Sequence, residues 1–310
     1  FTGGVEEGQR QLQESMALYG ELGDDSGRAT AMAYLSNAAL TAERMEEAED
    51  LARQAAQISL ERGSRAEYVH KLGVLGYALV MLGKYAQAHE VLEECIKIRQ
   101  GQEARYHNAH ARSALSMASL HLGLYSQARV HAETALVDAQ ATGLGYAVGH
   151  TLTVLGSVDL AEGRHAGAHS RLEEALVTFR EWGHTFYAIQ PLSLLSITAR
   201  ALGSRSEARQ HLVKALHLSV ELGRARALVW NLPQAALLLA DEGKAIRAVE
   251  LYALAERYPR VGNSRWFEDA VGRQVARAAA GLPPHVAVRA RERGQDLELG
   301  AVATELLAEL

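Results

Sequence analysis

The chain has 310 residues, of which 48% are hydrophobic and 22% are charged, and its formal net charge is −5. This composition is typical of an ordered protein and excludes a disordered chain. The 32 basic and 37 acidic residues are interspersed, so the basic stripe that phosphate contacts require is missing and we expect no direct nucleic-acid partner. No uninterrupted apolar run approaches 18 residues, and no basic and apolar leader opens the chain. We therefore expect no membrane association and a cytoplasmic location.

A forty-residue repeat runs through most of the sequence. Residues 5–22 match the second half of one unit, so the repeat begins in mid-unit and the chain looks like part of a longer protein. Glycine then recurs every forty residues, and each glycine is followed five residues later by an alanine. The two sets are Gly83, Gly123, Gly163, Gly203 and Gly243, and Ala88, Ala128, Ala168, Ala208 and Ala248. A period of this length without insertions indicates an array of identical supersecondary units.

Each unit contains two segments of helical period, for example 146–161 and 166–179, joined by a short turn at Gly163. A further glycine recurs at the far end of the unit, where a left-handed residue would end the second helix. Its positions are Gly23, Gly63, Gly143, Gly183 and Gly223, and Glu103 takes that place once. The alanines and a second small-residue column, seven positions further on, lie on one face of the second helix and let two helices approach closely. Cys95 belongs to that second column, so we interpret it as a buried thiol.

The spacing within the unit resembles the tetratricopeptide repeat. In the segment LGYALVMLGKYAQAHEVLEECI, Leu75, Gly76, Ala88 and Cys95 stand at the separations that this motif uses. The unit departs from the family in its length, forty residues in place of 34, and in lacking the usual proline near its end. The resemblance covers residues 1–255 and implies an all-α, right-handed superhelical solenoid of about six and a half helix-turn-helix repeats.

Repeats with such long helices are similar to the sensor arrays of signal-transducing ATPases with numerous domains (STAND regulators). They are also similar to intracellular peptide-pheromone receptors. The STAND resemblance implies that ATP binds to an upstream domain of the parent protein. We expect no cofactor in the chain itself, since it has no GxxxxGK[ST] motif and no strand to carry one.

Residues 256–310 leave the repeat register and are predicted to form a C-terminal helical cap on the solenoid of residues 1–255. We predict a loop over 257–263, followed by a helix that Ser264 begins and Gly281 ends. Pro283 and Pro284 would start the next helix, and a final amphipathic helix is expected over 301–310. A solenoid needs such an atypical end to cover its last apolar face.

The resemblance places the first helix of each unit on the concave face, which points to two columns of residues as a ligand-binding wall. The first column has polar and aromatic residues where leucine would be expected, and the second lies one helical turn earlier on the same face. The predicted site residues are His70, His110, His150, Gln190 and Trp230 from the first column and Tyr106, Tyr146, Phe186 and Arg226 from the second. Aromatic rings with hydrogen-bonding histidines suit a groove that orients a small molecule or peptide. The alternative is that some of these side chains pack between repeats and the others are solvated.

Pro191 and Pro233 fall within or near the start of first helices, so those helices either start late or kink. No catalytic residue and no metal site is predicted. His165 and His169 have the spacing of a metal pair, but no glutamate base stands between them and no third ligand is placed. The sequence therefore indicates a protein that is not an enzyme.

We interpret the chain as the sensor and interaction domain of a larger cytoplasmic STAND-type regulator. An inducer, which is a small molecule, a peptide or a protein, would bind the concave face and control upstream nucleotide-binding and effector domains of the same chain. Two alternatives stay open: the peptide-binding receptor domain of a transcription regulator, and a passive assembly scaffold. The sequence identifies neither the inducer, the output nor the oligomeric state. It also leaves open whether the groove is free or is occupied by another part of an autoinhibited parent protein.

Overall fold

Wherever a complete connection of the repeat array lies in the described residues, it is a three-residue turn with a left-handed middle residue. The computed structural model describes residues 2–99, 105–183, 185–223 and 225–310, without the side chains of 2–6, 105–107 and 225–226. Both predicted glycine columns have positive φ angles, between 61° and 90°, wherever they fall in these ranges. In the turn after residue 81, the amide N of Lys84 donates to the carbonyl of Leu79 at 2.9 Å, the long bond of a Schellman motif. Glu43 adopts φ 60° at the equivalent place, and Glu103 lies outside the described residues.

The turns separate two sets of helices. The first helices are α2 (Asp25–Thr41), α4 (Arg65–Met81), α6 (Arg105–His121), α8 (Gly145–Ala161), α10 (Ile189–Ala201) and α12 (Ala225–Asp241). The second helices are α1 (Thr2–Glu21), α3 (Met45–Glu61), α5 (Tyr85–Arg99), α7 (Tyr125–Ala141), α9 (His165–Glu181), α11 (Arg205–Glu221) and α13 (Ala245–Glu256). A short 3-10 helix, η1 (Thr185–Ala188), precedes α10. By its place in the repeat register, α1 is a second helix.

Small residues set the distance between the two helices of a repeat. The alanine column from Ala48 to Ala248 is completely buried, and so is Cys95 in the neighbouring column. The Sγ atom of Cys95 contacts the carbonyl oxygen of Val69 at 3.3 Å. At Gly76 an added Cβ would lie 2.3 Å from the Leu92 side chain of the second helix, which shows how closely the two helices pack there. The helical hairpin predicted from the small-residue columns is therefore confirmed.

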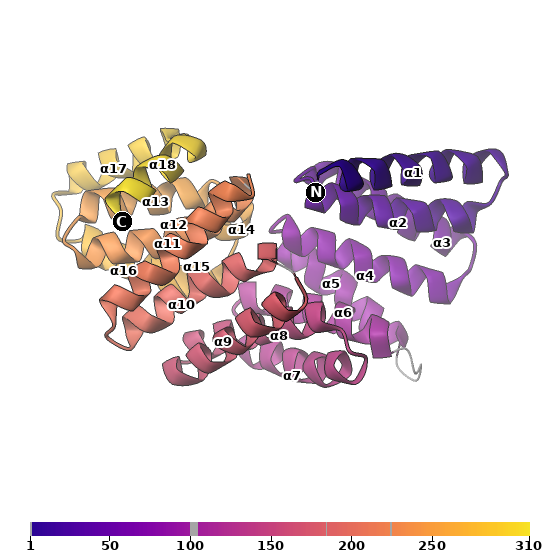
Figure 1. Ribbon diagram of the computed structural model, residues 1–310, viewed down its shortest axis with the longest axis horizontal. Coiled ribbons are helices and arrows are strands. Elements are labelled where there is room, and N and C mark those ends of the chain that lie inside the picture. Colours follow the sequence, from indigo (N-terminus) through magenta and orange to yellow (C-terminus); the bar gives the residue numbers. More distant parts are fainter. Residues whose placement is uncertain (1, 100–104, 184, 224) are drawn as a thin grey trace.

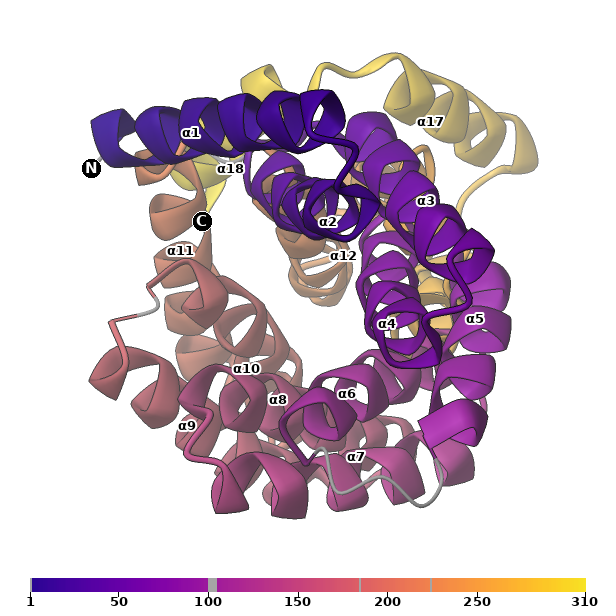
Figure 2. The same cartoon turned by 90° about the vertical axis from the view of Figure 1, so that its right-hand side faces the viewer.

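The repeats form a right-handed superhelix with the first helices on its inner side. Consecutive first helices pack on one another, from α2 on α4 through to α10 on α12, whereas contacts between consecutive second helices are at most sparse in the described part of the chain. Figure 1 shows the N-terminal and C-terminal halves side by side along the long axis. In Figure 2, viewed from the N-terminal end, the second helices from α3 to α11 follow one another clockwise around the outside as they recede. The inner wall is therefore built from first helices.

The C-terminal residues cap the array and also cross back over it. The elements are α14 (Pro259–Gly262), α15 (Arg265–Phe267), the π-helix η2 (Glu268–Gly272), α16 (Arg273–Ala279), α17 (Pro284–Asp296) and α18 (Leu299–Glu309). Helix α17 packs on α13, and α18 packs on α11 and α12, which covers the last repeat. The predicted loop over 257–263 is wrong, because Pro259 begins a short helix there and Val261 is buried. Ser264 caps the next helix as predicted, and its Oγ accepts from the Phe267 amide at 3.1 Å.

The two prolines of the first helices behave differently. Helix α10 begins at Ile189, directly after the 3-10 turn, so Pro191 lies near a late helix start. Pro233 lies inside α12, where its missing N–H leaves the Val229 carbonyl without its usual helical donor.

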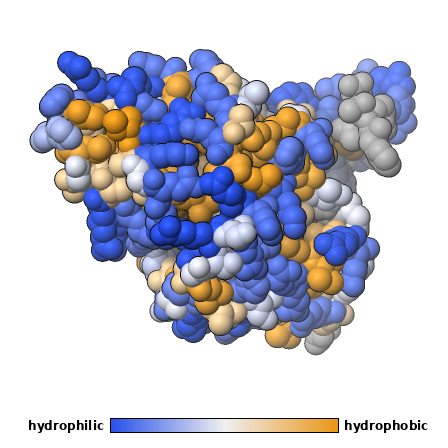
Figure 3. Space-filling model, turned by 60° about the vertical axis from the view of Figure 1, so that its left-hand side comes forward, coloured by the Kyte–Doolittle hydropathy of each residue, from blue (hydrophilic) through white to orange (hydrophobic). Residues whose placement is uncertain are grey.

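No helix in the described part of the chain combines the length and the apolar character that crossing a bilayer requires. On the face drawn in Figure 3, hydrophilic residues predominate and hydrophobic ones form separate patches, as expected of helices that bury one side.

Candidate ligand-binding site on the inner face

A cavity of about 460 Å³ opens on the inner side of the superhelix. Its wall comes from the first helices α2, α4, α6, α8 and α12, from the start of α3 and the turn before it, from η1 and from α14, so residues from both halves of the solenoid meet there. The lining residues are Asn37, Leu40, Thr41, Glu43, Met45, Tyr77, Met81, His110, Leu144, Tyr146, Ala147, Phe186, Tyr187, Ala227, Trp230 and Arg260. A volume of this size suits a small organic molecule or a few side chains of a peptide.

A continuous series of aromatic rings, which we call the aromatic ladder, runs along this wall. Its members are Tyr77, His110, Tyr146, Tyr187, Phe186 and Trp230. At its N-terminal end, the ring centroids of Tyr77 and His110 are 5.2 Å apart, and those of His110 and Tyr146 are 6.4 Å apart. The hydroxyl of Tyr146 also donates to the hydroxyl of Tyr77 at 3.2 Å, which joins α8 to α4 across the intervening repeat.

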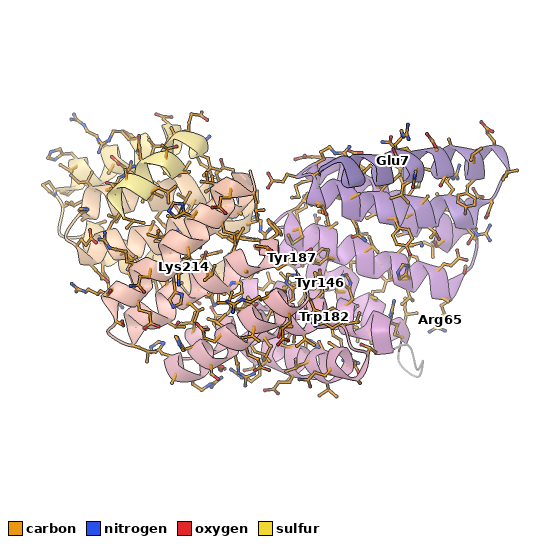
Figure 4. All side chains as sticks on the ribbon, in the orientation of Figure 1. Glu7, Arg65, Tyr146, Trp182, Tyr187 and Lys214 are labelled. Carbon is orange, nitrogen blue, oxygen red and sulfur yellow. The ribbon has the colours of Figure 1, made fainter. Side chains whose placement is uncertain are left out.

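The ladder continues into the C-terminal half through η1. The rings of Tyr146 and Tyr187 meet edge to face at 5.1 Å, and Figure 4 shows the two side chains close together near the middle of the molecule. Tyr187 then contacts Phe186 at 5.3 Å, and Phe186 lies 6.4 Å from Trp230. Edge-to-face contacts of this kind favour fixed ring positions. The ladder is thus a largely apolar wall built from α4, α6, α8, η1 and α12.

Arg260 completes the wall from outside the repeat register. Its guanidinium carbon lies 4.2 Å from the centroid of the Trp230 ring, a cation–π arrangement. The residue is buried, and its carbonyl accepts a hydrogen bond from the Tyr85 hydroxyl at 2.7 Å. Burial raises the pKa of Tyr77, and the positive charge of Arg260 opposes that rise. The charge of Arg260 therefore acts on Tyr77 as well as on Trp230.

Arg260 is held by a segment that we call the strut, residues 259–274, which crosses from α13 to the N-terminal half. Its first part rests on the turn after α4, where the Asn263 side-chain amide donates to the Gly83 carbonyl at 3.1 Å. An added Cβ at Gly83 would lie 2.5 Å from the carbonyl carbon of Pro259, so this turn tolerates only glycine. The strut is in this way seated against a repeat that lies about 180 residues earlier in the chain.

The rest of the strut follows the ends of the first helices. His121 Nδ1 lies 2.7 Å from Ser264 Oγ at the end of α6, and the Tyr125 hydroxyl donates to Asp269 at 2.7 Å. Trp266 is almost fully buried, and its indole N–H donates to the carbonyl of Ser157 in α8 at 2.9 Å. Burial and the nearby charge of Arg260 lower the pKa of His121 from its ordinary value of 6.5 to about 3. The imidazole is therefore neutral in the folded protein at neutral pH.

The structure brings together part of the predicted site. His110, Tyr146, Phe186 and Trp230 line the cavity. His150 is buried behind the wall, with its ring 4.6 Å from that of Tyr146. Whether these residues bind a ligand stays a prediction.

The other predicted positions lie elsewhere. Gln190 lines a small separate void beside Trp266, and His70 is half-buried outside the cavity lining. The side chains of Tyr106 and Arg226 lie outside the described residues. In the described part of the chain, no three His, Cys, Asp or Glu side chains converge as a metal site would require.

Sequence reasoning missed Tyr77, Tyr187 and Arg260. Tyr77 follows His70 by seven residues and so shares its helix face, a signal that was available. Tyr187 joins the wall because η1 replaces the expected first turn of a helix. Arg260 has no periodic signal, since the strut lies outside the repeat.

Comparisons with known proteins agree with this architecture. A family model described as Tetratricopeptide repeat matches residues 71–100. No curated protein sequence matches the chain significantly.

Solved structures with similar folds cover most of the chain at low identity. A Rap protein complexed with Competence and Sporulation Factor has a TM-score of 0.69 at 13% identity, over 96% of this chain and 86% of that one. Aspartyl phosphate phosphatase F from Bacillus subtilis has a TM-score of 0.57 at 16% identity, over 91% of this chain and 75% of that one. BtubC (BKLC) from P. vanneervenii has a TM-score of 0.55 at 16% identity, over 71% of this chain and 92% of that one. The chain therefore has a tetratricopeptide-like helical repeat fold, a class suited to binding partners.

Proposed function

We propose that the chain is a non-catalytic sensor domain that binds an inducer in the cavity on its inner face. One observation supports this proposal most strongly: a single cavity is lined by helices from both halves of the solenoid. These are α2 and α4 of the N-terminal half and α12 and α14 of the C-terminal half. A ligand in that cavity contacts both halves, so its affinity depends on their relative position. Differential affinity for two curvatures of the superhelix is what an inducer needs in order to shift a conformational equilibrium.

In the parent protein this shift would control an upstream nucleotide-binding switch of the STAND type and, through it, an effector domain. ATP would bind to that upstream domain and not to the solenoid. This part of the proposal rests on the resemblance of the forty-residue repeats to STAND sensor arrays. The inner face itself supports only the binding step.

Binding is tested first on the chain itself, with a library of small molecules and peptides screened by thermal shift and followed by calorimetry. We expect a ligand that loses at least tenfold in affinity, about 1.4 kcal/mol, in Tyr146→Ala. Tyr34→Ala is the matched control, because Tyr34 is exposed and does not line the cavity. A ligand that binds both variants as it binds the wild type would place the site elsewhere and refute the proposal.

The regulatory step requires the parent protein. We expect the same inducer to change the rate of nucleotide exchange on the upstream domain, and the change to be absent in Tyr146→Ala. Unchanged exchange in the presence of a bound ligand would remove the STAND role and leave a binding domain.

A peptide-receptor function is the second candidate. The similar Rap structure was determined as a complex with Competence and Sporulation Factor, which supports partner binding by a solenoid of this shape. A passive scaffold is the third candidate, and it predicts that Tyr146→Ala leaves the function of the parent protein unchanged.

A further inference from the structure

The N-terminal edge of the solenoid, formed by α1, has a face that is sealed in the later repeats (Figure 1). Gly8, Leu12 and Ser15 of α1 are only half-buried. In each of the second helices α3, α5, α7, α9 and α11, the residues at the three equivalent positions are 0% exposed. They run from Ala48, Ala52 and Ala55 in α3 to Ala208, Leu212 and Ala215 in α11. In the described part of the chain, α1 therefore lacks the cover that these columns have elsewhere.

The cover of these columns in the later repeats is the first helix of the same unit. Leu92 of α5 lies against Gly76 of α4, where an added Cβ would be 2.3 Å from the leucine side chain. Gly156 of α8 has the same relation to the leucine of α9, at 2.7 Å. The Sγ atom of Cys95 likewise contacts the Val69 carbonyl of α4. The helix that seals a second helix is thus the one that comes just before it in the sequence.

Helix α2 is open on the matching side. Tyr34 is 57% exposed, whereas the residues at the same place in α4, α6, α8, α10 and α12 are at most 6% exposed. Consecutive first helices pack on one another, so each of those five helices has a neighbour where α2 has none among the described residues. We call Gly8, Leu12, Ser15 and Tyr34 the N-terminal face. It is small and apolar, and it lies where one more first helix would stand in the array.

We propose that the N-terminal face is the docking site of an amphipathic helix from the upstream region of the parent protein. This inference rests on the part of the proposed function that places further domains upstream. The repeat register argues for this occupant, because Gly3 stands in the column of Gly83 and Gly163, whose turns join a first helix to its second helix. Helix α1 begins at Thr2, so Gly3 is helical here. Glycine can equally adopt the left-handed conformation of the turn once a helix docks.

Leu12 indicates what the docked helix must offer. It has the place of Leu92, which lies against Gly76 sixteen residues earlier. Opposite the other leucines of this column, in α9 and α11, stand Gly156 and Ser196. A large side chain at this position would overpack the contact. The docked helix is therefore expected to have an apolar inward face with glycine or serine opposite Leu12.

Helix α2 connects the N-terminal face to the cavity. Tyr34 belongs to the face, and Asn37 and Leu40 of the same helix line the cavity. A docked helix and a bound ligand would both contact α2, so each is expected to change the affinity of the other. Docking at this face would give the inducer a route to the upstream switch.

Cysteine labelling tests the docking in the parent protein. Ser15→Cys places a thiol in the N-terminal face, while the native Cys95 is fully buried. We expect Ser15→Cys to react with a maleimide about tenfold or more slowly in the parent protein than in the isolated chain. Glu14→Cys is the matched control, because Glu14 is exposed and its equivalents Gln54 and Glu94 stay exposed in sealed repeats. Its rate should be the same in both proteins.

A grafted helix tests the chemistry on the chain itself. Replacing residues 1–2 by a copy of residues 64–82 puts a first helix before Gly3 and the copied Gly76 opposite Leu12. We expect hydrogen exchange of the α1 amides to slow by about tenfold or more. The same graft with Gly76→Leu in the copy is the control, and it should give no such protection because two leucines would meet. Circular dichroism shows whether both grafted chains are folded.

The outcomes separate this inference from the proposed function. Equal labelling of Ser15→Cys in the parent protein and in the chain would refute the docking, and a ligand found in the library screen would still stand. Slow labelling of Ser15→Cys in the isolated chain, with a dimeric mass by light scattering, would assign the face to a second copy and also overturn the inference. Equal protection by the two grafts would refute the requirement for a small residue opposite Leu12. A protected Ser15→Cys with no ligand from the screen would overturn the inducer site and support the docking.

Discussion

A glycine pair provides a controlled test of how firmly the strut is seated. Gly83 and Gly163 occupy the same turn in different repeats, and both have φ +75°. An added Cβ at Gly163 meets nothing within 4 Å, whereas at Gly83 it would lie 2.5 Å from the Pro259 carbonyl carbon and 2.6 Å from the Arg260 amide N. Gly83→Ala and Gly163→Ala therefore impose the same backbone conformation and differ only in the contact with the strut.

The expected magnitudes follow from these contacts. Alanine in a left-handed conformation costs about 1 to 2 kcal/mol, and both variants lose this much. At Gly83 the clash is with backbone atoms, so no side-chain rotation relieves it and the strut must move. The bonds from Tyr85 to the Arg260 carbonyl and from Asn263 to the Gly83 carbonyl then weaken. At about 0.5 to 1.5 kcal/mol each, these bonds bring the additional loss to about 1 to 3 kcal/mol.

Urea unfolding followed by circular dichroism measures both free energies of unfolding. Hydrogen exchange of the amides in 259–274 reports on the strut alone, and we expect faster exchange there in Gly83→Ala and no change in Gly163→Ala. Equal destabilisation of the two variants, with unchanged exchange in the strut, would refute the inference that the strut is fixed against this turn.

Two further predictions concern the same segment. Since burial and the charge of Arg260 lower the pKa of His121 to about 3, its contribution to stability is complete above pH 6.5 and is lost as the pH falls from there toward 3, by about 1.4 kcal/mol per unit. His121→Gln should therefore lose less stability than the wild type between about pH 7.5 and 5.5 in urea titrations, and identical losses would contradict this assignment. Trp266→Phe removes the indole hydrogen bond to the Ser157 carbonyl and leaves a void, which should cost about 2 to 4 kcal/mol. Trp182→Phe, at an exposed tryptophan, should stay within about 0.5 kcal/mol of the wild type, and equal losses would show that Trp266 does not anchor the strut.

The repeat architecture could be predicted from the sequence because its determinants are local. In the described part of the array, left-handed residues at intervals of twenty positions follow the helices, and small residues at fixed spacing on the second helix set the interhelical distance. A search for glycine alone would miss the turn at Glu43, because this glutamate adopts φ 60° in the same place of its repeat. The surrounding helices impose the conformation, and the residue accommodates it.

The candidate site could be predicted in part. The first-helix columns contain His110, Tyr146 and Trp230, because curvature places first helices on the inner side and the repeat fixes which face they present. His70 belongs to the same column and still misses the cavity lining, since the column winds with the superhelix and only His110 and Trp230 of its members line that space. The forty-residue period predicts which face of a first helix points inward. It does not predict which repeats come close to one another around the superhelix.

The strut could not be predicted because it depends on contacts between distant parts of the chain. The loop expected over 257–263 is a buried helix, and no local pattern indicates that Pro259 meets Gly83. Its residues are ordinary for a connection between helices. Their burial comes from the superhelical turn, which brings the α4 repeat within reach of the residue that follows α13.

Arg260 links the strut to the proposed ligand site, and this link has a thermodynamic consequence. Its carbonyl accepts a hydrogen bond from the Tyr85 hydroxyl, and its guanidinium lies in the cavity wall beside Trp230. A ligand in the cavity that contacts Arg260 favours the seated strut, and by reciprocity a seated strut favours binding. Gly83→Ala, which lies outside the cavity lining, should then weaken a ligand found in the library screen by the factor that corresponds to the strut free energy it loses, while Gly163→Ala should leave the affinity of that ligand unchanged.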